Sequence, residues 1–146
     1  MMNLRFEKRT TFYVSGYGME TREESLEKDC ATLRAQYEDK LRSISDHLYF
    51  VAWMKNESEN IMIYHLGVEA PSQTPVTEGA TCVEVPGAKF AVATVPEGEP
   101  ILATWHKFFA TGLSSLGADM DMNYPINFES FDENGVCELW IPVKED

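Results

Sequence analysis

The sequence predicts an α+β fold in which two helices pack on one face of an antiparallel sheet. The order strand, helix, strand, strand occurs twice along the 146 residues, and elements in this order favour a sheet with its helices gathered on one face. Hydrophobic residues make up 44% of the chain and charged residues 25%, as in ordinary globular proteins. We therefore expect a single domain over residues 1–146, with pseudo-symmetric βαββ halves at about 8–70 and 82–146.

The first half begins with a strand at residues 10–19, where β-branched and aromatic residues precede glycines. Thr21 and Glu24 form a capping box that starts a helix. Residues 47–54 and 61–70 are expected to form a hairpin. Apolar residues recur along the helix at steps of three or four and form one amphipathic stripe: Leu26, Cys30, Leu33, Tyr37, Leu41 and Ile44.

The second half follows a connecting loop at residues 71–81, which contains two prolines and a glycine. A strand is expected at residues 89–95, and Pro100 suits the first turn of the second helix. A final hairpin joins residues 127–131 to 136–144. The apolar face of the second helix consists of Ile101, Leu102, Trp105, Phe108, Phe109 and Leu113.

The charge of the chain argues against direct contact with nucleic acid. Asp and Glu number 24 against 12 Lys and Arg, so the formal net charge is −12 at pH 7. Such a surface repels phosphate backbones, and no basic stripe offsets it. The same electrostatic field attracts cationic ligands.

The N-terminal sequence and the cysteines predict a cytoplasmic protein that does not enter a membrane. No apolar run has the character of a signal peptide or the length of a membrane span. The chain has three widely spaced cysteines, Cys30, Cys82 and Cys137, and this pattern favours reduced thiols over a disulfide framework. The three histidines are isolated from other ligating residues, so we expect no metal site and no cofactor.

The first strand of the first hairpin is apolar on both of its faces. Alternation places Tyr49, Val51 and Trp53 on one side. Leu48 and Phe50 lie on the other side. Two helices cover only one face of a six-stranded sheet, so the second face requires a ligand, a second subunit or connecting loops as its cover. We expect an aromatic ligand cleft on this second face.

Glu129 is the polar residue expected to meet the ligand. Alternation places it on the same side as Phe131, so its carboxylate either enters the cleft or lies on a solvated edge. A cationic ligand would supply the partner that a buried carboxylate needs, and aromatic rings add about 0.5 to 2 kcal/mol of cation–π attraction. Trp105 has an alternative position in the core between the second helix and the sheet. The expected ligand-binding residues are Glu129, Tyr64, Trp53, Trp140, Trp105 and Phe131.

Several segments agree with a known family in their order and spacing. They are YHLGVE at 64–69, PGAKFAV at 86–92, WHKFF at 105–109, FESFD at 128–132 and ELWIPV at 138–143. With the doubled βαββ order, they resemble the GyrI-like family, also called AraC-type effector-binding domains. The resemblance spans nearly the whole chain.

The resemblance implies a ligand cleft between two βαββ units. It also implies that a glutamate at the position of Glu129 meets the positive charge of aromatic, drug-like ligands. Some relatives carry a DNA-binding helix-turn-helix, for which residues 1–9 are too short. Phe131 stands where those relatives have a tyrosine, so a hydroxyl contact from that position is not expected.

We therefore expect a stand-alone small-molecule-binding protein, monomeric or weakly homodimeric, that captures cationic or aromatic amphiphiles. Its role would lie in transcription regulation or in protection against xenobiotics. The alternative is a hydrolase of an electrophilic aromatic xenobiotic, in which Glu129 or Glu69 activates water in the same cleft. No nucleophile, base and orienting group at diagnostic spacing supports this enzyme.

Overall fold

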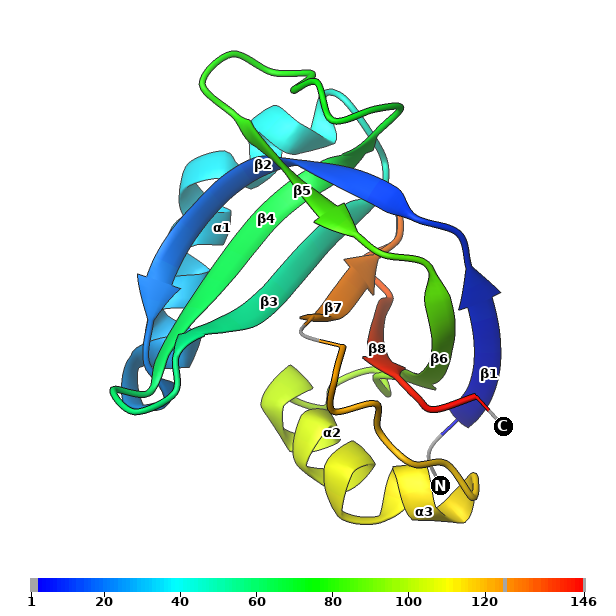
Figure 1. The fold of residues 1–146 in the computed structure, drawn as a ribbon. Helices are drawn as coiled ribbons and strands as arrows, with labels where there is room; N and C mark the ends of the chain where they lie inside the picture. The colour runs from blue at the N-terminus through cyan, green and yellow to red at the C-terminus, as the bar shows by residue number, and fades with distance from the viewer. Residues whose placement is uncertain (1–2, 125, 146) are drawn as a thin grey trace.

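The computed structural model describes residues 3–124 and 126–145 (Figure 1). Met1, Met2, Pro125 and Asp146, which the sequence analysis included in the domain, lie outside the described residues. The helical segments are η1 (Glu23–Ser25), α1 (Leu26–Arg42), α2 (Ile101–Lys107), the π-helical turn η2 (Phe108–Gly112) and α3 (Leu113–Ser115). The strands are β1 (Asn3–Arg9), β2 (Phe12–Thr21), β3 (Leu48–Asn56), β4 (Ile61–Ala70), β5 (Thr81–Val85), β6 (Ala88–Thr94), β7 (Ile126–Phe131) and β8 (Cys137–Pro142).

The strands form one antiparallel sheet in the order β1-β6-β8-β7-β3-β4-β2-β5. On the two sides of the β7–β3 contact, the series β7-β8-β6 mirrors the series β3-β4-β2. Each series has its helical segment between its first and second strands in the chain: α1 follows β2, and α2 follows β6. The predicted α+β fold of two βαββ units is therefore confirmed.

The sheet has eight strands and not the six that the sequence analysis predicted. The strands that were not predicted are β1, which pairs with β6, and β5, which pairs with β2. Both lie at the ends of the sheet, where a strand pairs on one side only and its outer residues meet solvent. Their alternating hydrophobic signal is correspondingly weak, and β1 carries four charged residues among its seven.

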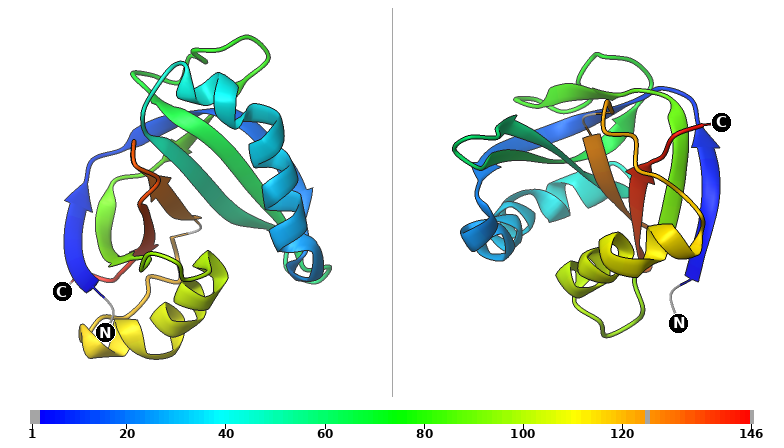
Figure 2. Two further views of the ribbon diagram at one scale, coloured as in Figure 1. Left: turned by 180° about the vertical axis from the view of Figure 1, so that it is seen from behind. Right: turned by 60° about the horizontal axis from the view of Figure 1, so that its bottom comes forward.

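The sheet is strongly curved, so that its two ends approach each other (Figure 2). β1 and β2 stand near opposite ends of the strand order, but only residues 10 and 11 join them. Residues 86 and 87 join β5 to β6 in the same way. The backbone N–H of Gly87 donates a hydrogen bond to Thr11 Oγ1 at 2.9 Å and so ties the two links together.

This curvature covers the face of the sheet that carries no helix. The ring centroids of Phe12 and Phe128 lie 5.5 Å apart, although two strands separate β2 from β7 in the sheet. Phe90 of β6 lies 5.3 Å from the same Phe128 ring. The sheet therefore folds over its own second face. The cluster enclosed there consists of Phe12, Val14, Tyr49, Val51, Val85, Phe90, Val92, Ile126, Phe128 and Trp140.

The helices pack on the opposite face of the sheet. Leu33 and Leu41 of α1 lie in the same buried cluster as Phe108 and Leu113, which follow α2. The two helices lie over different halves of the sheet and leave its centre between them (Figures 1 and 2). Within residues 3–124 and 126–145, no helix is long and apolar enough to cross a membrane.

Candidate functional site

A cavity of about 550 Å³ lies between α1 and α2, over the centre of the sheet. Its floor is formed by Phe50 of β3, Tyr64 of β4 and Glu129 of β7. Pockets of about 300 to 1,000 Å³ accept drug-sized molecules. The remaining lining residues are Glu23, Leu26, Glu27, Cys30, Ala31, Arg34, Met54, Asn60, Met62, Ile101, Leu102, Trp105, His106 and Phe109.

Strand register brings Glu129 to the centre of the molecule. Glu129 is the direct partner of Phe50 across the β7–β3 contact, where the two βαββ units meet. Phe50 is in turn the partner of Leu66 on β4, two residues from Tyr64. Residues that alternate along a strand share a face, so Tyr64 and Glu129 both lie on the helix-bearing side.

The carboxylate of Glu129 is buried, with 8% of the residue exposed. The indole Nε1–H of Trp105 donates a hydrogen bond to Glu129 Oε2 at 2.6 Å. Burial raises the pKa of Glu129 to about 7, whereas the Trp105 hydrogen bond and the charge of Arg34 act to lower it. Among the ion pairs of the described residues, none involves Glu129.

Two ionisable groups that interact with Glu129 are held neutral. Burial and the Glu129 charge raise the pKa of the Tyr64 phenol. The same two causes raise the pKa of the Cys30 thiol to about 12. Because the thiolate is the reactive form of cysteine, Cys30 is not suited to act as a nucleophile. Neither group offers a positive charge to the carboxylate.

Aromatic side chains of α2 and η2 form one wall of the cavity. Trp105 stacks on Phe109, with ring centroids 5.6 Å apart and an interplanar angle of 18°. Phe109 is 45% exposed and Met54 is 43% exposed, so both lie at the mouth of the cavity. The faces of aromatic rings carry negative partial charge and attract cations.

The structure brings three of the predicted ligand-binding residues together. Glu129, Tyr64 and Trp105 line the cavity. Phe131 shares their face of the sheet but lies beneath Arg34, with the guanidinium 4.6 Å from its ring centroid. It borders a neighbouring hollow instead of the main cavity.

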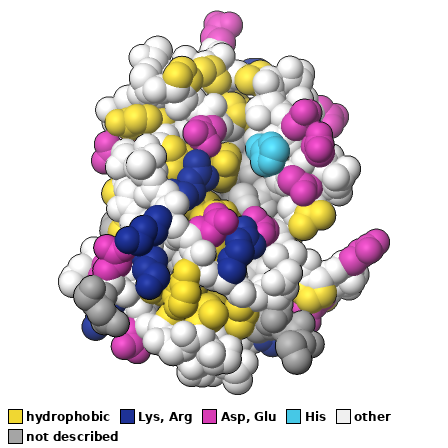
Figure 3. Space-filling model, turned by 90° about the vertical axis from the view of Figure 1, so that its right-hand side faces the viewer, with side chains coloured by type: hydrophobic (Ala, Val, Ile, Leu, Met, Phe, Trp, Pro, Cys, Tyr) yellow, Lys and Arg dark blue, Asp and Glu magenta, His cyan; other side chains and the backbone are white. Residues whose placement is uncertain are grey.

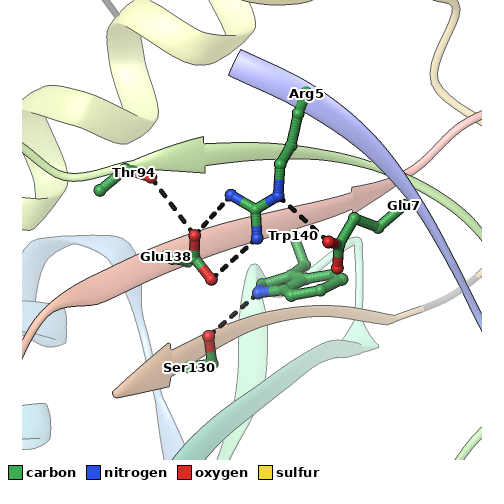
Figure 4. Close-up of polar contacts among 6 residues, drawn as sticks. All are labelled: Arg5, Glu7, Thr94, Ser130, Glu138 and Trp140. Atoms are coloured by element: carbon green, nitrogen blue, oxygen red, sulfur yellow. Dashed lines mark hydrogen bonds and ion pairs between the residues drawn. The ribbon is translucent and has the colours of Figure 1, made fainter. Parts of the chain in front are cut away.

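Trp53 and Trp140 belong to the other face of the sheet. The Nε1–H of Trp140 donates to Ser130 Oγ at 3.0 Å, and the ring lies beneath Arg5, which pairs with Glu138 (Figure 4). The predicted position of the cleft on the face opposite the helices is therefore wrong. The curved sheet closes that face, and the open space lies between the helices.

Helix α1 contributes side chains to the cavity, which was not predicted from the sequence. Leu26 and Cys30 were assigned to the buried stripe of the helix, but both line the cavity with Ala31 and Arg34. Met54 and Met62 were also missed. They are partners across the β3–β4 hairpin, and their flexible thioethers suit a wall that adapts to different ligands.

Glu69, the alternative catalytic carboxylate, lies away from the cavity. It accepts a hydrogen bond from Arg9 Nη2 at 3.0 Å and another from Tyr49, whose ring belongs to the cluster on the opposite face. Glu69 and Glu129 therefore cannot act together on one ligand. Among the described residues, no group of three His, Cys, Asp or Glu side chains is placed to hold a metal ion.

The basic residues of β1 are paired with acidic side chains. Arg5 pairs with Glu138, Lys8 with Glu145 and Arg9 with Glu69. Figure 3 shows this side of the molecule, where Lys and Arg side chains lie next to Asp and Glu side chains. Such pairing leaves little net positive charge on this face for a phosphate backbone.

Comparison with known proteins identifies a family and related folds. Residues 5–143 match the family model of the integron-associated effector binding protein, Cass2. No protein of curated function matches the chain.

Several solved structures share the fold. An integron cassette protein from the mobile metagenome of Vibrio cholerae is 13% identical, with a TM-score of 0.67, and the match covers 97% of this chain and 95% of that one. SAV2435 bound to tetraphenylphosphonium is 12% identical, with a TM-score of 0.73 and coverages of 98% and 94%. The C-terminal domain of EcmrR is 12% identical, with a TM-score of 0.63 and coverages of 100% and 99%.

Proposed function

This chain belongs to the family of integron-associated effector binding proteins, and from that membership we propose that it binds cationic, aromatic small molecules in the cavity between α1 and α2. The observation that carries the proposal is the carboxylate of Glu129, buried beneath an aromatic wall with no basic side chain in an ion pair with it among the described residues. A cation of suitable shape completes this site.

The proposal follows from the energetics of a buried acid. Ionised Glu129 loses hydration, and the hydrogen bond from Trp105 restores only part of the stabilisation. A ligand cation next to the carboxylate supplies the missing charge partner, and the ring of Trp105 adds cation–π attraction. Apolar parts of the ligand are then buried against Leu26, Leu102 and Met62.

A related structure supports the ligand class. SAV2435 was solved with tetraphenylphosphonium, an aromatic cation without a hydrogen-bond donor. A ligand of this kind is recognised through charge and apolar contact, and Glu129, Trp105 and Phe109 offer both here. We propose that the protein captures such molecules either to sequester them or to present them to a partner, in transcription regulation or in protection against xenobiotics.

A pair of ions with nearly the same shape tests the proposal. Tetraphenylphosphonium and tetraphenylborate differ chiefly in the sign of their charge. Titration calorimetry at pH 8, where Glu129 is largely ionised, is expected to show that the phosphonium binds at least tenfold more tightly. Equal affinity for the two ions, or tighter binding of the borate, would refute charge recognition in the cavity.

A further inference from the structure

Arg34 is a permanent cation on the wall of a cavity proposed to bind cations. Its guanidinium lies 4.6 Å from the centroid of the Phe131 ring, and Nη2 donates a hydrogen bond to Glu38 Oε1 at 2.8 Å. The side chain is 32% exposed. Its charge is near enough to the buried carboxylate to act on the pKa of Glu129. A ligand carrying only positive charge is repelled by Arg34, so its presence in the wall needs an explanation.

Arg34 also stands at the border between two spaces. Arg34 and Ile101 line both the main cavity and a second hollow of about 500 Å³. The second hollow is bounded by the turns at residues 95–99 and 134–137. The guanidinium is therefore within reach of a ligand in either space.

The Arg34 guanidinium has N–H donors that form no hydrogen bond within the described residues. Its bond to Glu38 uses Nη2, and no hydrogen bond within the described residues uses Nε or Nη1 of Arg34. A guanidinium binds a carboxylate through two parallel N–H donors, and such charge-assisted bonds are stronger than neutral ones. Stacking on Phe131 holds the donors in place before a ligand arrives.

We propose that the cavity accepts amphoteric aromatic ligands, in which a cationic group pairs with Glu129 while a carboxylate of the same molecule is bound by Arg34. This inference rests on the proposed function and extends it to a second charge of the ligand. Glu129 and Arg34 then act as two fixed charges of opposite sign that set the orientation of the ligand.

Apart from Arg34, the charged residues that line the two spaces are acidic. Glu97 and Glu99 border the second hollow, and Glu99 is already bonded to Thr104 and Lys107. Their negative charge opposes deeper entry of a carboxylate. The acidic residues Glu23 and Glu27 and the histidine His106 line the main cavity. Arg34 is thus the only Lys or Arg that lines either space within the described residues.

Two dyes separate this role from a simpler one. Rhodamine 123 is a methyl ester with one positive charge, and rhodamine 110 is its free acid, which is zwitterionic at neutral pH. In the simpler role, Arg34 only keeps Glu129 ionised. Replacing Arg34 would then weaken the binding of both dyes to the same extent. Fluorescence anisotropy at pH 8 measures the affinity of each dye for the parent protein and for Arg34→Met, which keeps an unbranched apolar side chain without the charge.

We expect Arg34→Met to weaken the binding of rhodamine 110 by a factor at least tenfold larger than any loss of affinity for rhodamine 123. Arg34→Lys, which keeps the charge but not the paired donors, should lose less affinity for rhodamine 110. Glu38→Gln releases the competing carboxylate from Arg34 and should tighten rhodamine 110 severalfold. Thermal melts of each variant establish that it is folded.

Four results would overturn the inference. If Arg34→Met loses equal affinity for both dyes, Arg34 has only the simpler role. If it loses affinity for neither dye, Arg34 takes no part in ligand recognition. A parent protein that binds rhodamine 123 but not rhodamine 110 refutes the amphoteric ligand and leaves the proposed function intact. Failure of the parent to bind rhodamine 123 refutes the proposed function together with the inference.

Discussion

Replacing Glu129 by Gln should weaken the binding of tetraphenylphosphonium about 30- to 150-fold at pH 8, because the interaction of a buried charge with its partner contributes about 2 to 3 kcal/mol. The amide has nearly the same shape as the carboxylate, and its oxygen can still accept the Trp105 hydrogen bond. The walls of the cavity therefore keep their positions, and the loss reports the charge alone.

Glu69→Gln is the matched control for this substitution. It removes one negative charge from the same sheet, but from a side chain bonded to Arg9 on the other face. Its effect on tetraphenylphosphonium should stay within about twofold, since charges at the surface are screened. If both variants bind the ligand as the parent does, the site is not organised around Glu129.

The second large effect concerns stability. The pKa of Glu129 is about 7 in the folded protein, above the ordinary value of 4.5. Below pH 4.5 the group is protonated in both the folded and the unfolded states. Between pH 4.5 and 7 the carboxyl group ionises in the unfolded state but stays largely protonated in the folded state. The stabilisation associated with the raised pKa is lost over this range, and above pH 7 the folded state carries a buried charge. The shift in pKa from 4.5 to about 7 corresponds to a decrease in the free energy of unfolding on the order of 3 kcal/mol between low and high pH.

Glu129→Gln removes this pH dependence. We expect the variant to be more stable than the parent at pH 8 and to lose that advantage towards pH 5, as measured by urea denaturation at a series of pH values. Taking the difference between the two proteins cancels the titration of the other carboxylates. A difference in unfolding free energy that does not change with pH would show that the pKa of Glu129 is not raised. Saturating tetraphenylphosphonium should restore the stability of the parent at pH 8.

Much of the fold could be predicted because its signals are local. The amphipathic stripe of α1 and the hairpin of β3 and β4 follow from periodicity and turn residues. Strands β1 and β5 could not be predicted in this way. Their pairing with β6 and β2 depends on the closure of the whole sheet, and their exposed outer residues leave little hydrophobic pattern.

The candidate site could be predicted only in part. Alternation identified that Glu129 and Phe131 share a face, and the structure places both on the helix-bearing side. Alternation does not reveal which face is covered and by what. The curvature that brings Phe12 against Phe128, with ring centroids 5.5 Å apart, arises from contacts between strands far apart in the sequence. The same curvature leaves the open space beside Trp105.

Proton release on binding reports whether the ligand pairs with the carboxylate of Glu129. At pH 6.5 a carboxyl group with a pKa of about 7 is mostly protonated, and a permanent cation binds its ionised form. Calorimetry of tetraphenylphosphonium in two buffers of different ionisation enthalpy should show release of roughly 0.7 proton per ligand for the parent protein. It should show none for Glu129→Gln. Binding to the parent without proton release, or equal release by both proteins, would contradict the pairing of the ligand with Glu129.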